Sequence, residues 1–118
     1  MAKRINKCIE LLESGQPFYA THPTELSYEA GVKDSQTWAD MLMMDFEHHP
    51  FDTIGLTNYM RGLRDGGPTP SGHLTPTILC TLPSNAITPD EVRYNAWQAR
   101  HVLSAGVHGI LHTHTRTA

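Results

Sequence analysis

The sequence lacks the features that mark several large classes of protein. It has two cysteines, Cys8 and Cys80, far apart and in no CxxC motif, so neither a disulfide framework nor a cysteine zinc site is predicted. We expect two buried thiols in a reducing cytoplasm instead. No apolar run approaches the roughly 20 residues that span a bilayer. These absences favour a cytoplasmic protein with no membrane partner.

An excess of positive charge is missing too. The chain has 9 Lys and Arg against 12 Asp and Glu, a formal net charge of −3, and no basic cluster that would bind nucleic acid. The basic amino terminus runs into an amphipathic segment that carries Glu10 and Glu13, which is not a signal-peptide core. With 118 residues, the chain is expected to form at most one domain, residues 1–118.

Apolar periodicity predicts an alternation of helices and strands. Helical spacing covers 4–14, 25–33, 54–63 and 89–104, and short apolar or β-branched runs cover 18–20, 41–46, 77–81 and 107–111. Short connections between alternating elements imply a parallel sheet with right-handed crossovers. The predicted fold class is α/β.

Residues suited to helix ends frame these segments. Caps are expected at Thr24, Asp52 and Thr88, and glycine stops at Gly15, Gly66 (left-handed) and Gly106. The strongest start is Thr88-Pro89-Asp90-Glu91, which combines a cap, a proline at the first helical position and a capping-box glutamate. Trp38 and Trp97 are expected in the core between helices and sheet.

Polar side chains gather where the second strand should end. The apolar run 41–44 stops at Asp45, followed by Glu47, His48 and His49. In parallel α/β sheets, reactive groups lie at the carboxyl ends of the strands. Two carboxylates and two imidazoles at such a point form a candidate acid–base cluster. His22 and His114 follow the first and fourth predicted strands and could reach the same edge.

Three segments resemble one known family in the same order and spacing. Asp45-Phe46-Glu47-His48 is similar to its D-x-E-H signature, 76–83 to its third-strand P-x-V-x-R-x-P segment, and 105–111 to its fourth-strand AGA-x-GI-x-x segment. The family is that of the HpcH/HpaI aldolases, which act on 2-keto-3-deoxy acids and are citrate-lyase-like. The resemblance covers most of residues 5–118.

The resemblance implies a TIM (β/α)₈ barrel of the phosphoenolpyruvate/pyruvate-binding type. Such barrels have about 250 residues, so this chain would supply the amino-terminal half, roughly four βα units, as a single partial domain. The family's metal-binding Glu and Asp come from strands five and six. They would therefore lie outside this chain, and no metal ligand is assigned within it.

The resemblance also implies a reaction. The family are class II aldolases, carbon–carbon lyases that hold a pyruvate enolate on Mg²⁺, Mn²⁺ or Co²⁺, with a 2-keto acid and an aldehyde as small-molecule partners. His48 would relay the proton of the aldol hydroxyl, and Asp45 would fix its tautomer. Thr81 stands where the family has an arginine and would contact substrate. His114, which matches a fourth-strand histidine of one member, and His22 would complete the substrate contacts.

Other interpretations of the same residues stay open. Glu47 is expected to support the site or form a salt bridge, and His49 to be a solvated loop residue. The chain could be a truncated, non-catalytic remnant, or a half barrel that requires association with another copy or another chain; family members assemble as homo-oligomers. A histidine metal module of His48, His49, His112 and His114 is the weakest alternative, since no spacing demands a shared ligand sphere.

Overall fold

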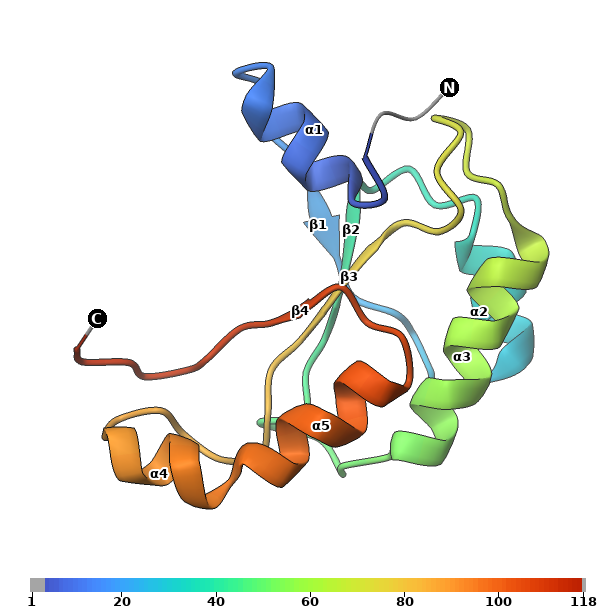
Figure 1. The fold of residues 1–118 in the computed structure, drawn as a ribbon. Coiled ribbons are helices and arrows are strands. Elements are labelled where there is room, and N and C mark those ends of the chain that lie inside the picture. Colours follow the sequence, from blue (N-terminus) through green and yellow to red (C-terminus); the bar gives the residue numbers. More distant parts are fainter. Residues whose placement is uncertain (1–3, 118) are drawn as a thin grey trace.

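The computed structural model describes residues 4–117. Its elements are α1 Lys7–Glu13, β1 Ala20–Thr21, α2 Tyr28–Asp34, β2 Met41–Met44, α3 Thr53–Gly66, β3 Thr77–Cys80, α4 Pro89–Tyr94, α5 Ala96–Ser104 and β4 Gly109–Ile110. The strands form one parallel sheet in the order β1-β2-β3-β4. The predicted alternation and parallel sheet are confirmed (Figure 1).

Most helix ends follow the expected chemistry. Asp52 caps α3 by accepting from the amide of Gly55, and Thr88 opens α4 with a complete capping box. Gly15 and Gly106 adopt positive φ after α1 and α5, at 71° and 102°. These residues stop their helices because glycine enters the left-handed region without a Cβ clash.

Two predicted ends were wrong. The cap of α2 is Ser27, not Thr24, because the Ser27 hydroxyl accepts from the amide of Ala30 and the helix starts later than expected. Gly66 is not left-handed: it is the last residue of α3, and Gly67 follows in an extended conformation. The extended Gly67 leads directly into Pro68, which disfavours helical geometry in the residue before it.

The predicted helix 89–104 is divided into α4 and α5 at Asn95. Asn95 has φ −108° and ψ 14°, and its side-chain amide donates to the carbonyl of Glu91 at 2.8 Å. Asparagine competes in this way with the backbone hydrogen bonds of a helix. The break allows α4 and α5 to run in different directions (Figure 1).

One face of the sheet packs against helices and forms the core. Alternate strand residues Leu42, Met44, Ile78 and Cys80 are at most 1% exposed and belong to one apolar cluster with residues of α3 and α5. Their helical partners include Leu56, Tyr59, Leu63 and Val102. The predicted core positions of two tryptophans were wrong, because Trp38 is 74% and Trp97 49% exposed.

Helices α2 and α3 touch backbone to backbone. A Cβ added to Gly31 would lie 2.2 Å from the carbonyl oxygen of Tyr59, and one added to Gly62 would lie 2.1 Å from that of Tyr28. Glycine is required at this crossing because any side chain would separate the helices. The tight crossing holds α2 and α3 together on one side of the sheet (Figure 1).

Helix α1 lies at the amino-terminal end of the strands. The hydroxyl of Thr77, the first residue of β3, donates to the side-chain oxygen of Asn6 at 2.8 Å, and Lys7 pairs with Asp40 just before β2. The opposite end of the strands carries the polar residues. Within residues 4–117, none of the helices is long and apolar enough to cross a membrane.

Candidate acid–base site

The carboxyl ends of β2 and β3 place Asp45 beside Thr81. The strands pair in register up to Met44 and Cys80, so the next residues of each chain are neighbours. The Thr81 hydroxyl donates to Asp45 Oδ1 at 3.1 Å and accepts from the amides of Phe46 and Glu47 at 3.0 and 3.2 Å. Thr81 is only 7% exposed. Its hydroxyl is fully engaged inside the protein, so it positions Asp45, a role different from the substrate contact implied by the resemblance.

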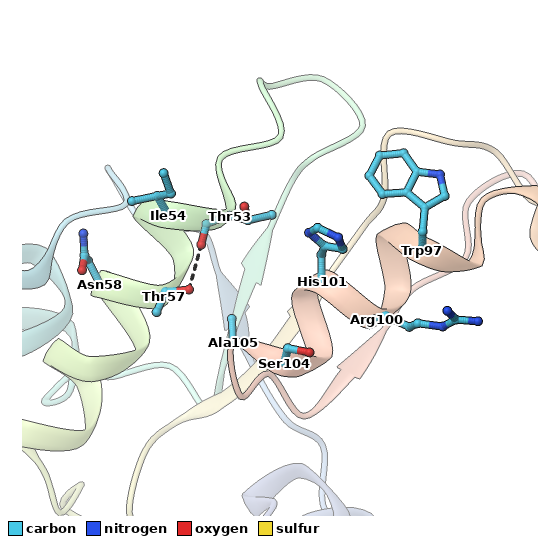
Figure 2. Close-up of a pocket in the computed structure, with 9 residues that line it drawn as sticks. All are labelled: Thr53, Ile54, Thr57, Asn58, Trp97, Arg100, His101, Ser104 and Ala105. Carbon is cyan, nitrogen blue, oxygen red and sulfur yellow. Dashed lines mark hydrogen bonds between the residues drawn. The ribbon is translucent and has the colours of Figure 1, made fainter.

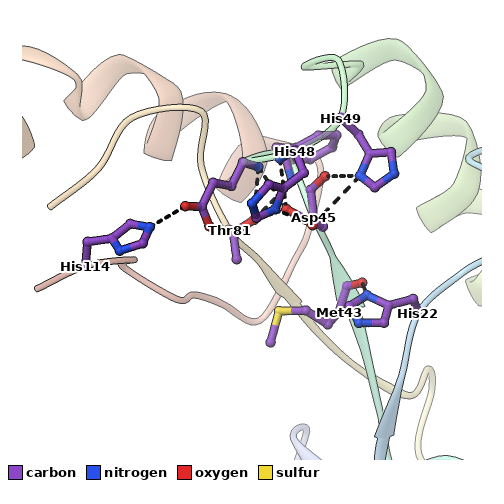
Figure 3. A network of polar contacts seen from close by, with 9 residues as sticks. His22, Met43, Asp45, His48, His49, Thr81 and His114 are labelled. Atoms are coloured by element: carbon purple, nitrogen blue, oxygen red, sulfur yellow. Dashed lines mark hydrogen bonds and ion pairs between the residues drawn. The ribbon is translucent and has the colours of Figure 1, made fainter.

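Asp45 and His48 form a hydrogen-bonded pair. Asp45 Oδ1 accepts from the amides of Glu47 and His48, and this turn returns the His48 ring to the carboxylate, with Nδ1 2.9 Å from Oδ2. Residues three apart at a strand end can touch only if the chain turns directly after the strand. The chain makes this turn after β2. The His48 side chain is 70% exposed. Its Nε2 is therefore available to a ligand (Figure 3).

The contacts of this pair shift the pKa of both groups. Burial opposes ionisation of Asp45, but hydrogen bonds from the ring and amide of His48 and from Thr81 outweigh it and hold the pKa of the carboxyl at about 2. The hydrogen bond to Asp45, its charge and the charge of Glu47 raise the pKa of His48 above its ordinary value. Asp45 is thus ionised at neutral pH and oriented toward the imidazole, the arrangement of a general base and its orienting carboxylate.

His22 and His49 border the same site. His49 Nδ1 lies 3.1 Å from the Asp45 carbonyl oxygen, and His22 Nδ1 lies 2.9 Å from that of Met43. Both rings line, with Asp45, a cavity of about 490 Å³ at the ends of β1 and β2. His49 is exposed as predicted but is tied to the turn, and His22 reaches the edge at which it was expected.

Glu47 and His114 form a second carboxylate–imidazole pair. Their Oε1 and Nε2 atoms lie 2.5 Å apart, although the residues follow different strands, β2 and β4. Figure 3 shows His114 approaching from the far side of Thr81 relative to His49. Sequence reasoning placed both residues near this edge but did not pair them. The signal was their shared position just beyond parallel strands.

One group of three side chains in residues 4–117 comes close enough to share a cation. The ligand atoms of Asp45, Glu47 and His48 lie within 4.8 Å of one another. Both carboxylates already make contacts: Asp45 accepts from His48, Thr81 and backbone amides, and Oε1 of Glu47 contacts His114. A cation held by all three side chains would compete with these contacts. The group therefore does not fit a metal centre and is better described as two hydrogen-bonded acid–base pairs.

No known protein family, curated protein or solved structure matches the chain. The function must therefore be argued from the site itself.

A second cavity, of about 610 Å³, opens between α3 and α5. It is lined by Thr53, Ile54, Thr57, Asn58, Trp97, Arg100, His101, Ser104 and Ala105 (Figure 2). Trp97 meets Phe51 and His101 edge to face, at centroid distances of 5.9 and 5.6 Å. Sequence reasoning missed this cavity because it assigned Trp97 to the core. Its side chains form no acid–base pair with one another among the described contacts.

Proposed function

We propose that the edge formed by Asp45, His48 and Thr81 is the acid–base site of a metal-dependent carbon–carbon lyase. It would act on 2-keto acids through a pyruvate enolate, on the amino-terminal half of a (β/α)₈ barrel. The observation that carries this proposal is the 2.9 Å contact between His48 Nδ1 and Asp45 Oδ2, which leaves the exposed Nε2 free. The position at the carboxyl ends of parallel strands also supports it.

In the cleavage direction, His48 is the base. Its Nδ1–H donates to Asp45, so Nε2 carries the lone pair and accepts the proton of the substrate's 4-hydroxyl. The electron pair of that O–H bond forms the aldehyde carbonyl, the C3–C4 bond breaks, and its electrons pass to the enolate of pyruvate. The ionised Asp45 stabilises the resulting imidazolium. A positioned base of this kind contributes about 10²–10⁴-fold in rate.

The metal of this chemistry, Mg²⁺, Mn²⁺ or Co²⁺, supplies a Lewis acid for the enolate oxygen when bound. The carboxylates of Asp45 and Glu47 do not fit as its ligands, because both are held in hydrogen bonds. The steps assigned to this chain are therefore proton transfers and substrate orientation. His22 lines a cavity together with Asp45, which supports its assignment as a substrate contact.

The test is release of pyruvate from 4-hydroxy-2-keto acids, coupled to lactate dehydrogenase, with Mg²⁺, Mn²⁺ or Co²⁺ added. We expect His48→Asn to release pyruvate about 10²-fold or more slowly than the wild-type chain. His101→Asn is the matched control, because His101 is exposed on α5 and has no contact with Asp45 or His48 among the described hydrogen bonds and ion pairs. Folded wild-type protein that releases no pyruvate, or a His48→Asn variant that is fully active, would overturn the proposal.

The sheet favours a second candidate, a non-catalytic half barrel that closes with a second copy. Met43 and Leu79 lie on the face opposite the core and are only half-buried, and Leu111 is 47% exposed. Strands β1 and β4 are the sheet edges, and unpaired edges favour association. Two copies related by an axis parallel to the strands would pair each β4 with the other's β1. Light scattering decides: a dimer without lyase activity supports this candidate, and a monomer with a cooperative melt contradicts it.

A further inference from the structure

We propose that Glu47 positions His114 as a second proton carrier of this site, which delivers a proton to the enolate carbon after the carbon–carbon bond has broken. The inference rests on the proposed lyase function and deepens it. It assigns a role to a pair of side chains that the cleavage step with His48 does not use.

The contact joins residues from strands that are not neighbours. Glu47 comes from the turn after β2 and His114 from the segment after β4, with β3 between those strands. The Glu47 side chain is 18% exposed and that of His114 is 58% exposed. The carboxylate is thus fixed in the protein, while the imidazole remains open to a ligand at the strand ends.

The backbone at His114 is held in an unusual conformation. His114 has φ 59°, the one positive value among non-glycine residues in the described part of the chain. The neighbouring Thr113 is anchored, because its carbonyl oxygen accepts from the amide of Ala86 at 2.9 Å. Left-handed geometry at a residue with a side chain persists when the surroundings determine it, and it concentrates at functional sites.

The two imidazoles of the site contact their carboxylates through opposite nitrogens. His48 is bound to its carboxylate through Nδ1, which leaves Nε2 free, whereas His114 is bound through Nε2, which leaves Nδ1 free. A carboxylate that accepts from one ring nitrogen fixes which nitrogen faces outward. Glu47 accepts from Nε2–H whether or not Nδ1 carries a proton, so it orients the ring through the whole cycle.

Protonation of the enolate at C3 is the step that we assign to this second carrier. Cleavage transfers one proton from the 4-hydroxyl to Nε2 of His48 and leaves the enolate of pyruvate. The enolate becomes pyruvate when the C2=C3 electron pair takes a proton at C3, and His114 Nδ1–H supplies it. His48 ends the cycle with one proton more and His114 with one proton fewer. Solvent restores both, since both side chains are exposed.

The titratable groups around this pair come from few elements. The segment after β2 contributes Asp45, Glu47, His48 and His49, and the segment after β4 contributes His112, His114 and Arg116. β1 is followed by His22, and β3 is followed by the uncharged Thr81. Among these groups, the carboxylate in contact with His114 is that of Glu47. Changing Glu47 alters the positioning of His114 and also removes a charge that raises the pKa of His48. Met and Gln remove that charge equally, so the difference between the two variants reports the contact with His114.

The experiment separates protonation at carbon from bond cleavage. Exchange of the pyruvate methyl protons in D₂O with Mg²⁺ reports transfer at C3 alone, and aldehyde release reports cleavage. We expect His114→Gln to slow the exchange by about 10²-fold and Glu47→Met by roughly tenfold, with smaller losses in aldehyde release. Glu47→Gln should recover much of the exchange, because its amide oxygen still accepts from Nε2–H. Side-chain ¹⁵N shifts should show the Nε2–H tautomer of His114 in the wild type and a mixture in Glu47→Met.

Each outcome decides the proposal. If exchange by Glu47→Met and His114→Gln equals that of a wild type that cleaves its substrate, the second carrier is overturned and the lyase function stands. If the wild type neither cleaves nor exchanges, the lyase function fails and the carrier role fails with it. An unchanged His114 tautomer in Glu47→Met overturns the positioning role whatever the activity.

Discussion

The Thr81 hydroxyl donates a hydrogen bond of 3.1 Å to Asp45 Oδ1, between the ends of two neighbouring strands. The same oxygen accepts from the amides of Phe46 and Glu47. A single buried hydroxyl therefore accepts hydrogen bonds from two backbone amides just after β2 and orients the Asp45 carboxylate, which in turn contacts His48.

Replacing this hydroxyl should destabilise the fold. Thr81→Val keeps the shape but leaves the buried amide of Phe46 without its acceptor, and we expect a loss of about 1–3 kcal/mol in the free energy of unfolding. Thr81→Ser keeps the hydroxyl and should lose about 1 kcal/mol or less, for the missing methyl group. Urea denaturation measures both. Equal losses in the two variants would contradict the role of the hydroxyl.

Asp45→Asn should lower the pKa of His48. The carboxylate raises that pKa through its hydrogen bond and its charge, and asparagine keeps an acceptor without the charge. Because the folded-state pKa is raised, the pair stabilises the protein below the ordinary pKa of histidine, and this contribution is lost as pH rises through the folded value. NMR titration of His48, with His101 on α5 as internal control, measures the shift. A His48 titration unchanged by the substitution would show that Asp45 does not act on it.

Ionisation of Asp45 should contribute to the loss of folding stability at acid pH. The native contacts hold its pKa at about 2, below the ordinary 3.8, so the unfolded chain binds this proton more readily. The stabilisation is complete above pH 3.8 and is lost as pH falls toward about 2, by at most about 2 kcal/mol. Urea melts of the wild type and Asp45→Asn across this range should converge toward the acid end. Parallel curves would contradict the assignment.

The sequence predicts the sheet and the turn better than the contacts between strands. The run 41–44 and the capping box at Thr88 are local patterns, and both were found as expected. The pairing of Glu47 with His114 depends on a 67-residue separation that no local pattern contains. Trp97 was misplaced because an aromatic residue on a helix is read as core, whereas α5 turns it into an open groove with His101. Thr24 and Ser27 offer the same hydroxyl chemistry, so the sequence does not decide which of them caps α2; in the structure it is Ser27.

The crossing of α2 and α3 should not tolerate a methyl group. In Gly62→Ala, the new Cβ would lie 2.1 Å from the backbone carbonyl oxygen of Tyr28, and backbone cannot move aside as a flexible side chain can. We expect a loss of about 2–4 kcal/mol or more, despite the better helix propensity of alanine. Asn58→Ala on the same helix is the control and should be near neutral. A Gly62→Ala variant as stable as the wild type would show that the helices can separate.

The two cysteines should react only when the protein unfolds. Both are free and buried, as predicted, and burial raises the pKa of Cys8 and raises that of Cys80 to about 12. Since the thiolate is the reactive form, folded protein should react with a thiol reagent such as DTNB at a rate limited by opening of the structure. Cys80, at 0% exposure beneath α3 and α5, should be protected more strongly than Cys8, which lies on the short helix α1. Measuring the rates in Cys8→Ser and Cys80→Ala separates the two thiols. Rapid labelling of Cys80 in native buffer would mean that the core between β3 and the helices opens far more often than its packing implies.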